Sequence, residues 1–254
     1  MRRSRVLLAA SGVAMAIVLG PLLVWARGDV RFDADWRTAD RASAGIAPAA
    51  GTTPEAVVQV YAARAFNWRG LFGIHTWIAT KPARADAYTV HQVIGWQLPA
   101  HGTAVDSRHD LPDRRWYDAE PWLLKDLRGD AAEALIPAIE HAVARYPYGD
   151  RYVLWPGPNS NSFVAWIARE VPGLQLSLPA TAIGKDWLGD ERRVARAPSG
   201  TGWQVSIGGY FGVLVARHEG LEFNLGGAVL GVDLRRPALK LPGVGRLGLP
   251  AAVD

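Results

Sequence analysis

Residues 152–167 read YVLWPGPNSNSFVAWI, and the fold that the sequence predicts is organised around this stretch. It begins as a short apolar run typical of a strand. The Pro-Gly-Pro of residues 156–158 ends that run, because proline has no N–H to donate and glycine permits unusual turns. The four residues from Asn159 to Ser162 are all of types that cap helix N-termini. The apolar spacing from Phe163 onward is that of a buried helix face, so the stretch predicts a strand, a sharp turn, a polar cluster and a helix.

This junction places hydroxyl and amide side chains beside free backbone N–H groups at the positive end of a helix. Many enzyme nucleophiles occupy such a position, which makes Ser160 a candidate nucleophile and Asn159, Asn161 and Ser162 candidate binding residues. A helix that is simply well capped has the same sequence pattern. Both interpretations stay open at this stage.

The composition indicates a globular chain with a substantial core. Its 254 residues are 49% hydrophobic, enough for one large domain or two small ones. The sequence contains no cysteine, which excludes disulfides, thiolate zinc sites and a cysteine nucleophile. Its eleven tryptophans are scattered along the chain, a distribution that favours packing over an aromatic binding groove.

The amino terminus predicts a membrane anchor. Arg2, Arg3 and Arg5 precede an uncharged apolar run over 6–26, which is about the length that crosses a bilayer as a helix. Positive charge before the run predicts a cytoplasmic amino end, and hence a single-pass inner-membrane protein with its domain in the periplasm. A cleaved signal peptide is the alternative, because residues 24–26 also resemble a cleavage site.

The charge beyond the anchor is too small to predict nucleic acid as a partner. The formal net charge is +4, and the three arginines before the apolar run contribute three of these charges, which leaves about +1. The polar loop over 99–115 contains two histidines and several aspartates, but their spacing matches no metal motif. We therefore predict neither a metal nor another cofactor.

The chain divides into four predicted segments. Residues 1–26 form the anchor or signal, 27–53 a linker, 54–236 an α+β domain, and 237–254 a tail over the surface.

Within the domain, three apolar runs over 56–66, 71–80 and 87–96 are joined by short loops. Short loops favour antiparallel neighbours, so these runs predict a three-stranded meander. Residues 116–126 are expected to be partly strand.

A helix is predicted over 131–146, with Asp130 as its cap and Glu133 completing a capping box. Pro137 lies in its interior and is expected to kink the helix or shift its start. Further along, two glycine-rich apolar runs over 203–216 and 221–234 predict a C-terminal β-hairpin. Glycine at this density suggests bulges or close backbone approach.

The candidate chemistry joins two separate features. His75 lies in the middle of a predicted strand, and a nucleophile at Ser160 needs such a base within hydrogen-bond reach. His91 or Gln92, on the adjoining strand, is the candidate partner that orients the base. The structural alternatives are a half-buried histidine bonded to the backbone and a serine that serves as a helix cap.

Two short strings carry a resemblance to a known family. Residues 71–77, LFGIHTW, followed much later by the Tyr152–Phe163 stretch, resemble the circularly permuted NlpC-type branch of the papain-like hydrolases. There a Gly-x-His strand precedes an Asn-Cys-x-x-Phe helix start. The resemblance spans about 56–171 and implies an antiparallel sheet packed on helices, with His75 as base and Ser160 at the cysteine position.

Serine in place of cysteine changes the function that this resemblance implies. A serine hydroxyl is barely ionised at neutral pH and is a weak nucleophile unless strongly activated. We therefore expect a catalytically degenerate, ligand-binding domain of the cell envelope. The alternative is a hydrolase or acyl transferase that uses Ser160, His75 and His91 on an envelope amide or ester.

Two further strings, WPGPNSNSF at 155–163 and LPATAIGKDW at 178–187, resemble an uncharacterised bacterial family known only as a domain of unknown function. This resemblance spans about 54–188 and implies no activity. Lys185 and Asp186, in the second string, either line the same cleft or form a surface ion pair. The sequence does not distinguish peptidoglycan, lipid and envelope protein as the ligand.

Overall fold

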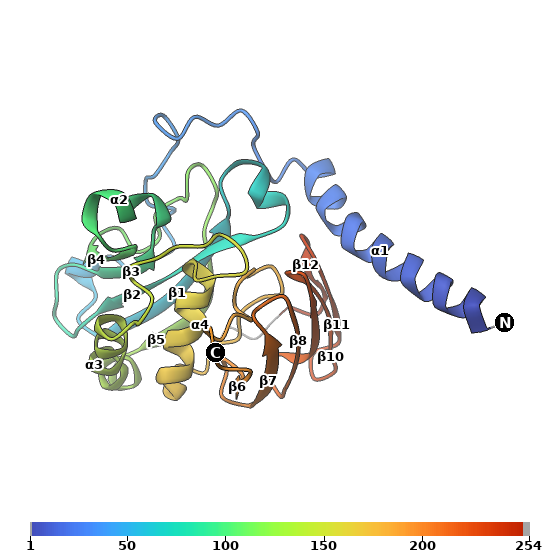
Figure 1. Cartoon of the computed structure of the whole chain (residues 1–254). Helices are drawn as coiled ribbons and strands as arrows, with labels where there is room; N and C mark the ends of the chain where they lie inside the picture. Colours follow the sequence, from blue (N-terminus) through green and yellow to red (C-terminus); the bar gives the residue numbers. More distant parts are fainter. Residues whose placement is uncertain (1, 251–254) are drawn as a thin grey trace.

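The computed structural model describes the backbone of residues 2–250 and the side chains of residues 11–250. Two antiparallel sheets and the helices that cover the first of them make up the body of the protein, and a long N-terminal helix projects from it (Figure 1). This arrangement confirms the predicted α+β class.

The first sheet has five strands in the order β4-β3-β2-β1-β5. Its first three strands in the chain form the predicted meander, although each strand is shorter than the predicted run and 3-10 turns lie between β1 and β2 and after β3. The strands are β1 (Val57–Arg64), β2 (Ile74–Lys81), β3 (Thr89–Val93), β4 (Val105–His109) and β5 (Trp122–Arg128). The 3-10 turns are η1 (Ala50–Thr52), η2 (Asn67–Leu71), η3 (Gly95–Gln97) and, after the last helix, η4 (Pro172–Leu174).

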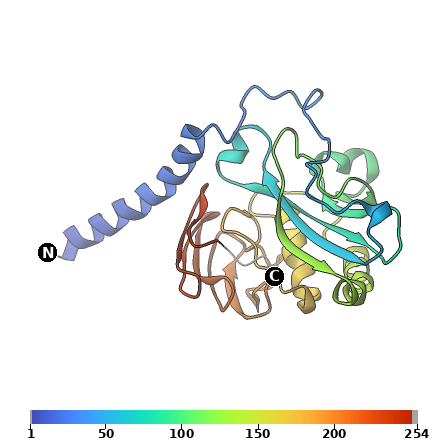
Figure 2. The same cartoon turned by 180° about the vertical axis from the view of Figure 1, so that it is seen from behind.

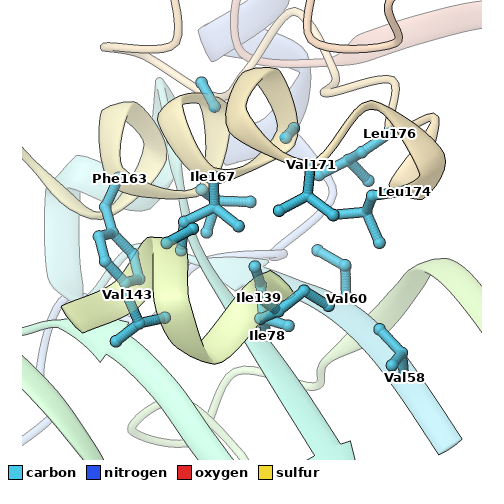
Figure 3. Packing of buried hydrophobic residues seen from close by; sticks show 14 of the residues in the cluster. Val58, Val60, Ile78, Ile139, Val143, Phe163, Ile167, Val171, Leu174 and Leu176 are labelled. Atoms are coloured by element: carbon cyan, nitrogen blue, oxygen red, sulfur yellow. The ribbon is translucent and has the colours of Figure 1, made fainter. Parts of the chain in front are cut away.

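Two helices cover one face of this sheet and form the main hydrophobic core with it. Helix α3 (Asp130–Ala144) packs on β1 and β5, and α4 (Ser160–Glu170) packs on β2 and β3. Figure 3 shows Phe163 and Ile167 of α4 meeting Ile139 of α3 above Val60 and Ile78 of the sheet. We call this side of the sheet the helix face.

Loops cover the other face of the first sheet, which we call the loop face. Tyr61 and Trp77 stack there with ring centroids 5.6 Å apart. The Trp77 indole N–H donates to the carbonyl of Pro112 (2.7 Å), and the Tyr88 hydroxyl donates to that of Pro48 (2.9 Å). The buried aromatic side chains thus satisfy their polar atoms with loop backbone.

Asp113 fixes the segment predicted as a linker to the loop face. Its buried carboxylate accepts hydrogen bonds from the Ser43 hydroxyl (2.7 Å) and from the backbone N–H groups of Ile46 (2.7 Å) and Ala47 (3.1 Å). The part of 27–53 nearest the domain therefore packs on it.

The second sheet is a seven-stranded meander in the order β12 to β6, larger than the hairpin that we predicted. Each glycine-rich run forms two strands, because Gly208-Gly209 and Gly226-Gly227 adopt positive φ and turn the chain. The segment after 236 adds two more strands. The strands are β6 (Val194–Arg196), β7 (Gly202–Ile207), β8 (Phe211–Ala216), β9 (Gly220–Leu225), β10 (Ala228–Asp233), β11 (Ala238–Leu241) and β12 (Gly245–Gly248).

Three local predictions need correction. The apolar run at 152–155 is not a strand, since it bends so that the Val153 N–H donates to the Pro158 carbonyl (2.8 Å). Gly129, not Asp130, is the N-cap of α3, and Glu133 accepts from the Ala83 N–H instead of closing a capping box. The loop at 99–115 contains β4 and the end of the short helix α2 (Leu98–His101).

Helix α1 (Arg2–Ala26) leaves the body on the side of the second sheet, as both views show (Figures 1 and 2). A Cβ added at Gly20 would lie 1.8 Å from the carbonyl oxygen of Pro242, in the turn between β11 and β12. Among the residues whose side chains are described, no helix is long and apolar enough to cross a membrane. The arginine flank and residues 6–10 of the predicted anchor lie outside that set, so anchoring stays a prediction.

A buried ion cluster joins the second sheet to the segment after α4. Glu222 of β9 accepts hydrogen bonds from the ammonium groups of Lys185, which follows α4, and Lys240 of β11, the latter at 2.5 Å. All three side chains are buried. Lys240 also donates to the carbonyl of Glu219 (2.6 Å).

The charges in this cluster hold one another in the ionised state. Burial alone would raise the pKa of Glu222, but Lys185 and Lys240 outweigh it and hold the pKa below its usual value. Burial would lower the pKa of Lys185, but Asp186 and Glu222 raise it. Glu222 and Lys185 are therefore ionised at neutral pH.

Removing the central carboxylate should destabilise the protein strongly. Glu222→Gln leaves two buried ammonium groups without their shared carboxylate, and breaking a buried ion pair typically costs about 3–5 kcal/mol. Urea unfolding should show this loss, whereas the exposed Glu191→Gln should change stability by less than about 0.5 kcal/mol. Equal effects of the two substitutions would contradict a structural role for the cluster.

Candidate functional site

The polar cluster at the start of α4 caps that helix. The Asn159 side-chain oxygen accepts from the backbone N–H groups of Asn161 (2.9 Å) and Ser162 (3.0 Å). The Ser162 hydroxyl accepts in turn from the Asn159 N–H (2.7 Å), which completes a capping box. These bonds occupy the N–H groups of Asn161 and Ser162 in the first turn, two of the donors that a bound anion would otherwise use.

The amide groups of Asn159 and Asn161 also tie α4 to its surroundings. The Asn161 amide donates to the carbonyls of Ile74 in β2 (3.0 Å) and Ile183 (2.8 Å), and its oxygen accepts from the Thr76 hydroxyl (3.0 Å). The Asn159 amide donates to Ile183 as well (3.1 Å). Both candidate binding residues are buried, and their amide groups already hydrogen-bond to other parts of the fold.

Ser160 is buried beside these groups. Its backbone carbonyl accepts from the Thr76 hydroxyl at 3.4 Å. Within the described part of the chain, no hydrogen bond to its own hydroxyl is found, from a histidine or from any other residue. A serine nucleophile needs a base at hydrogen-bond distance.

His75 projects from the opposite face of β2. Successive strand residues alternate between faces, so Thr76 reaches α4 on the helix face while His75 lies on the loop face. There the His75 ring stacks on Trp116, with ring centroids 3.5 Å apart and planes inclined by 10°. The structure does not bring His75 and Ser160 together.

Gln92 is the partner of His75. The Gln92 amide donates to Asp106 (3.0 Å), so its oxygen remains to accept from Nε2–H of His75 (3.0 Å). This assigns the proton of His75 to Nε2 and leaves Nδ1 unprotonated. Burial lowers the pKa of His75 to about 4, although the bond to Gln92 opposes that shift, so the ring is neutral at physiological pH.

His91 lies on the helix face, because it sits directly opposite Ile78 in the register between β2 and β3. Its ring nitrogens contact the hydroxyls of Thr80 (3.1 Å) and Ser107 (2.8 Å). Burial lowers its pKa to about 4. His91 therefore does not orient His75, and the three side chains predicted to form one catalytic group are separated in the structure.

Tryptophan and tyrosine side chains surround His75. We call the group formed by Trp96, Trp116 and Tyr117 the aromatic platform. Trp96 and Trp116 lie 5.7 Å apart between ring centroids, and Trp116 and Tyr117 lie 5.1 Å apart. Trp96 is 60% exposed, so the platform presents an indole ring to solvent beside a buried histidine.

A polar row crosses the sheet next to this platform. It runs from His75 through Gln92 to Asp106, whose other carboxylate oxygen accepts from Arg108 (3.0 Å). Residues of β2, β3 and β4 thus contribute one continuous hydrogen-bonded chain. Strand alternation was the signal for it, because alternation puts Gln92, and not His91, on the face of His75. No sequence pattern predicted that Trp116, which lies in a loop, would stack on His75.

Lys185 and Asp186 form the predicted ion pair, with Lys185 Nζ 3.6 Å from Asp186 Oδ1, but the pair is buried and not on the surface. Both are buried, with Lys185 bonded to Glu222 and Asp186 accepting from the Gln204 amide. Their role in the structure is to join the segment after α4 to the second sheet.

If the polar cluster is a cap, its residues should differ in their effect on stability. Asn159→Ala removes a cap acceptor and should cost about 1–2 kcal/mol in urea unfolding. Ser160→Ala removes a hydroxyl with no partner in the described part of the chain, and should change stability by less than about 0.5 kcal/mol. A larger effect for Ser160→Ala than for Asn159→Ala would contradict this assignment.

Comparison with known proteins supports one of the two resemblances seen in the sequence. A family model described as a protein of unknown function (DUF3750) matches residues 55–187. No curated protein matches the chain. No solved structure matches it either, so the papain-like resemblance stays a prediction. Because the family model covers more than half of the 254 residues, the chain belongs to the DUF3750 family of proteins of unknown function.

Proposed function

We propose that this chain is a membrane-attached protein of the cell envelope that binds a glycan at the aromatic platform, and that Ser160 is not a nucleophile. One observation carries the proposal: His75, Trp96 and the polar row share the loop face of the first sheet, away from Ser160.

The aromatic platform has the surface properties that sugar rings require. An exposed indole offers a flat apolar face with a polar edge, and such side chains contribute large contact area at binding sites. The ring of Trp96 is supported from behind by Trp116 and Tyr117, which restrict its motion. Restricted side chains lose less entropy when a ligand binds.

Arg108, at the exposed end of the polar row, supplies hydrogen-bond donors that a glycan hydroxyl would need. Arg108 is half exposed and joins the carboxylates of Asp106 and Asp110, at 3.0 and 3.4 Å. A few oriented polar groups beside an aromatic surface are typical of small-molecule sites. A glycan of the envelope, with peptidoglycan as the first candidate, matches both parts of this surface.

The alternative function, a Ser/His-dependent hydrolase or acyl transferase, has less support. Ser160 lies on the helix face with no base beside it, and the neutral His75 contacts Trp116 and Gln92 instead. Attachment to the inner membrane with a periplasmic domain is supported by the arginine flank and the apolar run at the amino terminus.

Removing the exposed indole should weaken glycan binding. We expect purified peptidoglycan sacculi to sediment the full-length protein, and Trp96→Ala to reduce its apparent affinity about tenfold, because a well-placed aromatic contact contributes roughly 1 kcal/mol or more. Trp36→Ala is the matched control, since Trp36 is 54% exposed and lies outside the platform. Sedimentation should remain unchanged in that variant.

Two results would count against the proposal. Equal losses for Trp96→Ala and Trp36→Ala, or no sedimentation of the unmodified chain, would exclude the platform as a glycan site. Labelling by a serine-directed acylating probe that disappears in both Ser160→Ala and His75→Ala would support the hydrolase instead, since a positioned base is typically worth about 10²–10⁴ in rate.

A further inference from the structure

The outward surface of the second sheet is apolar, although outward strand residues are usually polar. In β7, Trp203, Val205 and Ile207 point outward, and the alternating residues Gln204 and Ser206 are buried. An antiparallel sheet with one solvated face normally shows the opposite alternation. β9 repeats the inversion, with Glu222 and Asn224 buried, whereas β8 also turns apolar residues outward but buries Leu214 on the other side.

The strand register brings these outward side chains into continuous rows. Val205 of β7 lies opposite Val213 of β8, which lies opposite Phe223 of β9. We call the whole surface the apolar face, and each member is 38% to 61% exposed. Its members are Val194, Trp203, Val205, Ile207, Phe211, Val213, Val215, Phe223, Leu225 and Leu239. Contiguous exposed apolar surface of this kind marks an interaction site.

The buried side of the sheet fixes this orientation. Glu222 and Lys240 are held there by the ion cluster, and Gln204 donates to Asp186 and accepts from Arg169 (2.7 Å). A shift of one residue in register would expose this cluster and bury the apolar side chains. The charged groups of the cluster would then lose their hydrogen-bond partners. The fold therefore requires the apolar side chains to point outward.

Within residues 194–250, the exposed charged side chains are all positive, and just before β6 the exposed Asp190 and Glu191 are followed by the exposed Arg192 and Arg193. Between residues 194 and 250 the acidic residues are Glu219, Glu222 and Asp233, and all are buried. Exposed arginines lie at one end of the sheet, at the end of β6 and in the turns that follow β8 and β10: Arg196, Arg217, Arg235 and Arg236. Positive side chains at one end of an apolar surface match an anionic lipid surface.

Helix α1 adjoins the same side of the molecule. It contacts the β11–β12 turn near Gly20 and leaves the body beside the second sheet (Figures 1 and 2). Its exposed side chains include Met15, Leu22 and Trp25. The helix that the sequence predicts to enter the membrane therefore leaves the body beside the edge of the second sheet formed by β11 and β12.

From these observations we propose that the apolar face lies on the surface of an anionic bilayer and forms a second membrane contact besides α1. The side chains of the face enter the acyl boundary, while the arginines meet lipid phosphates. A second copy of the chain fits less well, because the acidic residues between 194 and 250 are buried and its apolar face would offer no anionic group to these arginines. The proposal is independent of the glycan site, which is on the first sheet.

The test uses the full-length chain in vesicles of phosphatidylglycerol and phosphatidylethanolamine. Because the sequence has no cysteine, Val213→Cys can carry a single environment-sensitive fluorophore on the apolar face. Glu140→Cys, exposed on α3, is the matched control for a label on the rest of the body. Nitroxide lipids should quench the label at 213 several-fold more strongly than the label at 140, and iodide in the water should do the reverse.

Two further comparisons sharpen the result. Phe223→Glu in the Val213→Cys background changes an outward side chain, so the fold should persist while quenching by lipid is lost. Vesicles of phosphatidylcholine alone should also reduce quenching. Equal lipid quenching at 213 and 140, or free access of iodide to 213, would overturn the proposal. Protection of 213 from both quenchers would overturn it in favour of a second copy or a protein partner.

Discussion

The contact on which the rest of the structure most depends is the carboxylate of Glu222 between the ammonium groups of Lys185 and Lys240. The contact joins β9 and β11 of the second sheet to Lys185, which follows α4 and lies within residues 55–187, the part that the family model matches. Buried charges tolerate few alternative arrangements, because an unpaired ammonium in the interior is costly. The register of the second sheet, and with it the identity of the outward residues, follows from this one cluster.

Alternation of side chains between the two faces of a strand also determines which residues form the candidate site on the first sheet. Thr76 and His75 are neighbours in sequence, yet one meets the start of α4 and the other stacks on Trp116. Within the polar cluster at 159–162, the side chains of Asn159 and Ser162 cap α4, and the Asn161 amide bonds the helix to β2. What remains available to a ligand is the exposed indole of Trp96 and the half-exposed Arg108 at the end of the polar row.

The sequence predicted the parts of the fold that depend on local pattern. The meander of β1 to β3 and the start of α4 at Ser160 follow from apolar periodicity, turn residues and capping side chains, which act over a few positions. The seven-stranded sheet was predicted as a hairpin, because Gly208-Gly209 and Gly226-Gly227 suggest bulges and turns equally until their positive φ is known.

The parts of the site that sequence did not predict depend on long-range contacts. The sequence alone suggests a surface pair at Lys185 and Asp186. In the structure both are buried, because Glu222 and Gln204 of the second sheet hydrogen-bond to them. Trp116 reaches His75 from a loop about forty positions later in the chain. Neither contact leaves a periodic signal, since each joins segments whose spacing in sequence is arbitrary.

The central claim is that the second sheet keeps its polar side inward and its apolar side outward. Single-cysteine variants along β7, in protein purified without vesicles, test it directly because the chain has no thiol of its own. A small water-soluble maleimide should modify Val205→Cys and Ile207→Cys rapidly, and Gln204→Cys and Ser206→Cys slowly, because thiol modification requires access. The reverse pattern, or equal rates at all four positions, would contradict this structure of the second sheet and the lipid surface inferred from it.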